Sequence, residues 1–182
     1  YEGKTCYAAS AYLTTEKPAE TAAASGQDGQ AGASAAASRN AGEVGLNMDW
    51  KYASLSKINS GKAVLYRSEA ASRKNKVVCV NAGHGTKGGS SVKTQCHPDG
   101  TPKVTSGTTS AGATTAVAVS GGMTFADGTP EAKVTLSMAR VLKDKLLARG
   151  YDVLMIRESD DVQLDNVART VLANNLADCH IA

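Results

Sequence analysis

The chain has 182 residues, which is enough for one medium-sized domain and an appendage. Apolar residues make up 42% of it but aromatic residues only 4%, so the core must be mainly aliphatic. The net charge is +3, from 20 basic and 17 acidic residues, without a dense block of lysine or arginine. This balance argues against a nucleic-acid-binding protein. No stretch approaches about 18 consecutive apolar residues, so we expect no membrane-spanning helix.

Residues 1–75 are predicted to form an N-terminal extension. Within it, residues 19–45 are of low complexity and rich in Ala, Gly and Ser. Such a composition cannot bury enough surface to offset the entropy of ordering, and it is typical of a flexible linker. Residues 46–67 contain the single Trp and the strand-like stretch KAVLYR. We expect them to pack on the main domain.

The main domain is predicted to begin at residue 76. Residues 77–81 form a short apolar run that predicts a strand, followed by a glycine-rich turn containing His84. Residues 86–129 are rich in Gly, Ser and Thr with little periodicity. A long insertion of this kind in a compact domain is usually functional or mobile.

Residues 129–150 predict an amphipathic helix, with Thr129 as its N-terminal cap and Gly150 at its end. Residues 160–178 predict a second helix. The expected inward-facing residues are Val134, Met138, Val141, Leu142 and Leu146 in the first helix and Leu164, Val167, Val171 and Leu172 in the second.

Strands are predicted at residues 151–157 and 179–182, so strands and helices alternate along the main domain. This order is typical of parallel strands joined by right-handed crossovers. The predicted fold class is therefore α/β, a three-layer sandwich with a mostly parallel sheet flanked by helices. In such sheets ligands bind at the carboxyl ends of the strands, and His84 follows the first strand at that edge.

The glycine-rich turn contains a formal G-x-G-x-x-G pattern, formed by Gly83, Gly85 and Gly88. A dinucleotide site requires a helix directly after the last glycine and an acidic residue at the end of a second strand, about 20 positions later. Neither is present, so we reject a nucleotide-binding loop.

A metal site is the other interpretation of this turn. Catalytic zinc takes three protein ligands, usually His or carboxylate, and keeps a fourth position open. His84 supplies an imidazole, and Glu131 supplies a carboxylate in the first turn of the next predicted helix. A third ligand is expected from the end of another strand.

The stretch KVVCVNAGHG and the segment from Glu131 to Asp178 resemble the zinc-dependent N-acetylmuramoyl-L-alanine amidases of bacterial cell-wall turnover. In that family a histidine in a G-H-G-type turn after the first strand binds zinc. A glutamate that opens the next helix, in an E-x-x-V-x-L setting, is the second ligand. The resemblance covers residues 76–182 and implies that His84 and Glu131 are ligands of Zn²⁺.

The resemblance also implies which parts of the site come later. The family's third ligand falls shortly beyond Ala182, and its catalytic glutamate, the general base, lies further on. We therefore expect no catalytic residue up to Ala182, and we expect the C-terminal remainder of the same polypeptide to complete the sheet and the zinc site. Asn81 and Ala82 depart from the common D-P-G-H-G form of the turn.

Other candidate residues have simpler interpretations. His97 is expected in a turn, His180 within a strand near the core, and Arg157 in a structural ion pair. None of the four cysteines forms a C-x-x-C pair, so a cysteine zinc site is not predicted. Cys79 and Cys179 are expected as reduced, buried thiols. A disulfide between Cys6 and Cys96, both in polar loops, remains open.

The resemblance implies an enzyme that hydrolyses the amide bond between N-acetylmuramic acid and L-alanine in peptidoglycan. It also implies a secreted bacterial protein that acts on the cell wall, as an autolysin does, and no nucleic-acid partner. Substrate-binding residues are not identified. Two alternatives stay open: a non-catalytic peptidoglycan-binding or regulatory module that retains the fold, and an assembly subunit that binds through its N-terminal arm.

Overall fold

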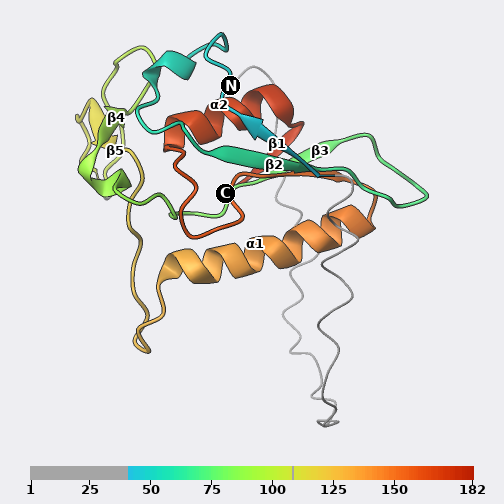
Figure 1. The fold of residues 1–182 in the computed structure, drawn as a ribbon. Helices are drawn as coiled ribbons and strands as arrows, with labels where there is room; N and C mark the ends of the chain where they lie inside the picture. The colour runs from blue at the N-terminus through green and yellow to red at the C-terminus, as the bar shows by residue number, and fades with distance from the viewer. Residues whose placement is uncertain (1–40, 108) are drawn as a thin grey trace.

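The computed structural model describes residues 41–107 and 109–182, which form a five-stranded sheet, a two-stranded sheet and two long helices (Figure 1). The large sheet consists of β1 (Ala41–Gly45), β2 (Lys62–Tyr66), β3 (Val77–Val80), β6 (Asp152–Met155) and β7 (Cys179–Ile181). The small sheet consists of β4 (Lys93–Gln95) and β5 (Thr115–Val117). The long helices are α1 (Glu131–Ala148) and α2 (Asn166–Leu176), and short 3-10 helices lie at η2 (Ala53–Leu55) and η3 (Gly89–Ser91).

The large sheet is mixed, with strand order β1-β2-β6-β3-β7. β3 is parallel to β6 and β7, whereas β2 is antiparallel to β1 and β6. The prediction of a mostly parallel sheet is therefore corrected. Parallel strands need a crossover of about a dozen residues or more, usually a helix. Residues 67–76, which join β2 to β3, contain no helix, so β2 enters the sheet in the opposite direction.

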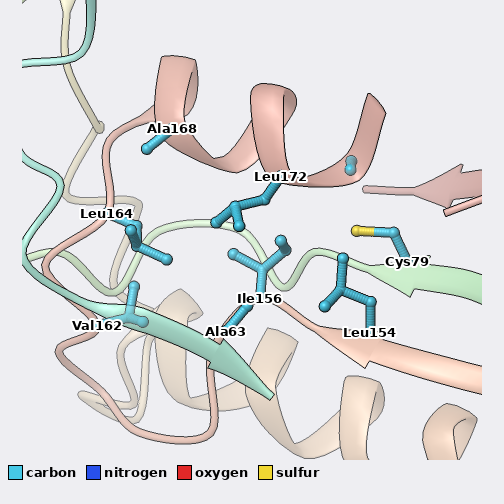
Figure 2. Packing of buried hydrophobic residues seen from close by; sticks show 9 residues of the cluster. Ala63, Cys79, Leu154, Ile156, Val162, Leu164, Ala168 and Leu172 are labelled. Carbon is cyan, nitrogen blue, oxygen red and sulfur yellow. The ribbon is translucent and has the colours of Figure 1, made fainter. Parts of the chain in front are cut away.

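The two helices pack on opposite faces of this sheet (Figure 1). Successive strand residues point to opposite faces, so Cys79 and Leu154 join the cluster under α2 whereas Val80 and Val153 join the cluster under α1. Figure 2 shows the α2 side, where buried side chains from β2, β3, β6 and α2 meet. Its labelled members are Ala63, Cys79, Leu154, Ile156, Val162, Leu164, Ala168 and Leu172.

The prediction for the buried face of α1 is partly wrong. Leu142 and Leu146 pack against the sheet as expected, but Met138 is 66% and Val141 56% exposed. The buried positions are Leu136 and Ala139. The predicted positions and the buried positions both have helical spacing. The buried set contains the small Ala139, which lets the helix lie closer to β3 and β6. Leu164, just before α2, and Val171 and Leu172 within it are buried as predicted, whereas Val167 is partly exposed.

The segment before β3 is part of the same fold. Trp50 and Ala63 pack in the cluster under α2, which confirms that residues 46–67 pack on the main domain. Asp165, the N-cap of α2, accepts hydrogen bonds from the backbone N–H of Lys57 at 2.6 Å and of Ile58 at 2.9 Å. Residues 41–45, expected in the flexible linker, form β1 instead. The rest of that linker, and the arm before it, lie outside the described residues.

The topology selects one end of the sheet as a binding edge. The chain leaves β3 toward α1 on one face and leaves β6 toward α2 on the other. The loops after these two adjacent parallel strands therefore diverge at their carboxyl ends. This is the switch point at which α/β sheets bind ligands, and the turn with His84 is one of the two loops.

Candidate metal centre

His84 lies in a constrained turn four residues after β3. Its φ is 64° and that of Gly85 is 73°, so two successive residues adopt the left-handed region. This region is unfavourable for a residue other than glycine and persists only where the surroundings determine it. The side chain of His84 is 20% exposed and meets Glu131 at the start of α1.

A backbone carbonyl sets the tautomer of His84. Nδ1 of the imidazole lies 2.9 Å from the carbonyl oxygen of Ser120. Because a carbonyl oxygen can only accept, Nδ1 must carry the proton in this contact. The lone pair of a neutral imidazole is then on Nε2, which faces Glu131. Metal-binding histidines are commonly oriented in this way by a carbonyl or carboxylate at their other nitrogen.

Glu131 is the first residue of α1, where the positive end of the helix dipole favours a carboxylate. Its Oε2 accepts a hydrogen bond of 2.8 Å from the backbone N–H of Met123 and lies 3.1 Å from Nε2 of His84. The Met123 bond, followed by the His84 contact, lowers the pKa of Glu131 from its ordinary value. The carboxylate is therefore ionised at neutral pH. The expected cap, Thr129, does not cap α1; the N-cap is Pro130, which makes no side-chain cap hydrogen bond.

The facing atoms of His84 and Glu131 fit a divalent cation. A lone pair on Nε2 and an ionised Oε2 at 3.1 Å repel each other unless a proton or a cation lies between them. Two ligands in a tetrahedral zinc site, with bonds of about 2.0–2.1 Å, are about 3.3 Å apart. The observed separation is close to this value, and an imidazole with a carboxylate is a donor set that zinc accepts.

Residues 120–123, here called the strap, enclose this pair. Ser120 and Met123 provide the backbone contacts to His84 and Glu131. At Gly122, with φ of 80°, an added Cβ would lie 2.9 Å from Cδ2 of His84, so the backbone lies directly against the ring. The sequence did not identify the strap, because its contacts come from backbone groups and a missing side chain. The Gly121-Gly122 pair was the available signal.

The other histidines lie apart from this pair. Nδ1 of His97 contacts Oγ1 of Thr101 at 3.0 Å, in the turn where His97 was expected. His180 lies in β7 opposite Cys79, as a strand residue. Within the described residues its Nε2 is buried without a hydrogen-bond partner, and burial lowers the pKa of the ring.

Arg157 forms the ion pair that was expected, whereas one of the cysteines differs from its prediction. Nη1 of Arg157 lies 3.9 Å from Oδ1 of Asp160, and the hydrogen bonds of Arg157 go mainly to backbone carbonyls. Cys79 is a buried free thiol as expected, and burial raises its pKa to about 12. Cys179 is also free within the described part of the chain but is exposed. The possible Cys6–Cys96 disulfide falls partly outside the described residues and stays a prediction.

The structure thus brings His84 and Glu131 together, whereas their role as zinc ligands stays a prediction. Among residues 41–107 and 109–182, no three His, Cys, Asp or Glu side chains cluster in a way that could hold a metal ion. In the same part of the chain, no helix is long and apolar enough to cross a membrane.

Comparison with known proteins gives one family. No curated protein matches the chain, and no solved structure matches it. The family model for N-acetylmuramoyl-L-alanine amidase (Amidase_3) matches residues 78–181, which is more than half of the 182 residues. The matched region runs from β3 to β7 and contains His84 and Glu131 with the crossovers that bring them together. The chain therefore belongs to the N-acetylmuramoyl-L-alanine amidase family.

Proposed function

We propose that this protein is a zinc-dependent hydrolase that cleaves the amide bond between N-acetylmuramic acid and L-alanine in peptidoglycan. It would act outside the membrane, on the bacterial cell wall, as a secreted enzyme. The family membership supports the substrate class. The observation that carries the zinc dependence is the 3.1 Å approach of Nε2 of His84 to Oε2 of Glu131, with Nδ1 already bonded to the Ser120 carbonyl.

The remaining ligand and the general base are proposed to follow Ala182. β7 is parallel to β3, with Ile181 opposite Val80, and the backbone N–H of Asn81 donates to the carbonyl oxygen of Ile181 at 2.8 Å. The chain after Ile181 therefore leaves the sheet beside the chain that leads to His84. A histidine a few positions later would reach the same edge. The C-terminal remainder of the polypeptide is the partner that this site requires.

The residues of the site have distinct tasks in this proposal. When bound, Zn²⁺ would supply Lewis-acid polarisation of the scissile carbonyl and activation of water. His84 and Glu131 would hold the ion at the carboxyl end of β3, and Ser120 would keep the proton of His84 on Nδ1. A carboxylate beyond Ala182 would take a proton from water and deliver it to the leaving amine of L-alanine.

The test uses the full-length protein on purified peptidoglycan, with newly exposed L-alanine amino groups as the product. We expect a chelator to abolish release and Zn²⁺ to restore it, with about one zinc bound per domain. Substituting a residue that only supports a metal ligand typically costs about 10- to 100-fold in metal affinity or activity. His84→Ala and Glu131→Ala should each lower the rate by more than this. His97→Ala, which removes a histidine from a distant turn, is the matched control and should leave zinc content and rate unchanged.

The alternative, a non-catalytic wall-binding or regulatory module, has one observation in its favour. The His84–Glu131 contact can also be an ordinary ion pair if the imidazole is doubly protonated. In that case the wild-type protein would bind peptidoglycan without releasing L-alanine amino groups. It would also contain no zinc, and His84→Ala would not change binding.

A further inference from the structure

Two arginine side chains are buried beneath the turn that carries His84. Arg157, which follows β6, is 0% exposed, and Arg169, in α2, is 1% exposed. A buried guanidinium is unfavourable unless its N–H groups find acceptors. In this protein the acceptors include the backbone carbonyls of the turn, so the side chains bind the loop that carries His84.

The two guanidinium groups reach three successive carbonyls of that turn. Nε of Arg157 and Nη1 of Arg169 donate to the oxygen of Ala82, at 3.1 and 3.2 Å. Nη2 of Arg157 donates to the oxygen of Gly83 at 2.9 Å, and Nη2 of Arg169 to the oxygen of His84 at 2.7 Å. Every backbone carbonyl from residue 82 to residue 84 therefore accepts a bond from a buried arginine.

One atom connects the two candidate ligands. Nη2 of Arg157, which donates to Gly83, also donates to the carbonyl oxygen of Ala132 at 2.6 Å. Gly83 precedes His84 in the chain, and Ala132 follows Glu131. The same nitrogen thus fixes the distance between the turn and the first residues of α1, which sets the separation of the imidazole and the carboxylate.

The backbone of the turn is shaped to receive this side chain. An added Cβ at Gly85 would lie 2.7 Å from Cζ of Arg157, and the φ of Gly85 is 73°. The carbonyl oxygens of Ala82, Gly83 and His84 accept their bonds from buried guanidinium groups. Since the left-handed conformation of His84, a residue other than glycine, needs support from its surroundings, the arginine bonds to the turn help to maintain it.

The geometry points to Arg157 and Arg169 as positioning residues that hold His84 and Glu131 at the separation that a metal ion requires, before any ion binds. This inference rests on the proposed function, because it takes His84 and Glu131 as ligands. Neither arginine touches the metal or the substrate in this arrangement. A ligand pair that is ordered in advance loses less entropy on binding, so the affinity for the ion is the property that the arginines should control.

The experiment measures Zn²⁺ binding to the metal-free, full-length protein, and the absorption spectrum of bound Co²⁺ as a report on coordination geometry. Lys keeps the charge of Arg157 but lacks the planar fork that reaches several carbonyls at once. We expect Arg157→Lys and Arg169→Lys each to weaken Zn²⁺ binding by about 10- to 100-fold, and to change the Co²⁺ spectrum.

A milder variant covers the case in which an arginine variant does not fold. Oγ1 of Thr135 donates to the oxygen of Gly83 at 3.0 Å and accepts from Nη2 of Arg157 at 3.1 Å. Thr135→Val removes these two bonds and leaves the charge in place. It should weaken Zn²⁺ binding in the same direction, with a smaller effect.

Two controls separate positioning from general stability. Arg149→Lys changes an exposed arginine at the end of α1 and should leave Zn²⁺ affinity unchanged. Asp152→Asn breaks a buried polar cluster at the amino end of β6, away from the turn, and should lower the thermal midpoint without affecting Zn²⁺ affinity.

The outcomes distinguish this inference from the proposal beneath it. Suppose that the wild-type protein binds Zn²⁺ and His84→Ala does not. The positioning role is then overturned if Arg157→Lys or Thr135→Val keeps the Zn²⁺ affinity and the Co²⁺ spectrum of the wild type. The positioning role is also overturned if Asp152→Asn has the same thermal midpoint as Arg157→Lys and loses as much Zn²⁺ affinity. If wild-type and His84→Ala proteins bind Zn²⁺ equally poorly, the proposed metal site fails, and the inference with it.

Discussion

Gly122 is a residue whose missing side chain shapes the site. Its φ is 80°, and an added Cβ would lie 2.9 Å from Cδ2 of His84. We expect Gly122→Ala to destabilise the protein by about 1–2 kcal/mol, because alanine is unfavourable in the left-handed region. We also expect weaker Zn²⁺ binding, because the methyl group pushes the imidazole away from Glu131. Thermal unfolding and Zn²⁺ titration measure the two effects.

The neighbouring glycine is the control. A Cβ added at Gly121 would have no atom within 4 Å. Gly121→Ala should therefore change the free energy of unfolding by less than about 0.5 kcal/mol. It should also leave the affinity for Zn²⁺ unchanged. Equal effects of the two substitutions would show that the close approach of Gly122 to His84 has no consequence.

The approach of His84 to Glu131 could be predicted from the sequence because both residues follow local signals. One stands in a glycine-rich turn after an apolar strand, and the other opens a helix. The partners of this pair could not be predicted. Ser120 acts through a carbonyl oxygen, and the two buried arginines act on the carbonyls of residues 82–84 from sequence positions more than 70 residues away. Backbone groups carry no residue-specific signal, so only the folded chain shows where they meet.

At the scale of elements, α1 shows how a correct helix can be assigned the wrong face. Val134, Met138 and Val141 have helical spacing, as do Leu136 and Ala139, and periodicity alone cannot choose between two apolar stripes. The structure buries the second stripe, with Leu136 only 4% exposed.

The direction of a strand in the sheet is similarly difficult to predict. A strand at 62–66 was visible in the sequence, but its direction depends on the helix-free connection to β3.

The assignment of the α1 face is testable by a pair of substitutions. Leu136→Ala should lower the free energy of unfolding by about 3 kcal/mol, because it leaves a cavity at a buried position. Met138→Ala removes an exposed side chain and should change the free energy by less than about 0.5 kcal/mol. Urea denaturation measures both. A larger loss for Met138→Ala than for Leu136→Ala would reverse the assignment of the buried stripe.

At the scale of the whole molecule, the two ends of the sheet have different roles. The carboxyl ends of β3 and β6 present the candidate metal pair, whereas the amino end of β6 carries a buried structural carboxylate, Asp152. Asp152 accepts hydrogen bonds from Arg67 at 2.7 Å, from the backbone N–H of Ser68 at 2.9 Å, and from Arg73 at 2.7 and 2.9 Å. It thereby ties the connection between β2 and β3 to the start of β6.

This arrangement predicts how stability depends on pH. Burial alone would raise the pKa of Asp152, but the hydrogen bonds from Arg67, Ser68 and Arg73 outweigh it and hold the pKa below its usual value. An unfolded Asp has a pKa of about 3.9. Since the folded pKa is the lower one, the stabilisation is fully present above about pH 4 and is lost as the pH falls through the folded pKa.

Asp152→Asn isolates this contribution. At pH 6 it should lower the free energy of unfolding by about 2 kcal/mol, the range expected for hydrogen bonds to a charged group. Below pH 4 the wild-type protein loses the same contribution by protonation, so the two stability curves should converge. Asp49→Asn, at an exposed turn position, should follow the wild-type curve throughout. If the difference between Asp152→Asn and wild type were the same at pH 2.5 as at pH 6, the ionised carboxylate would not be the group that stabilises this end of the sheet.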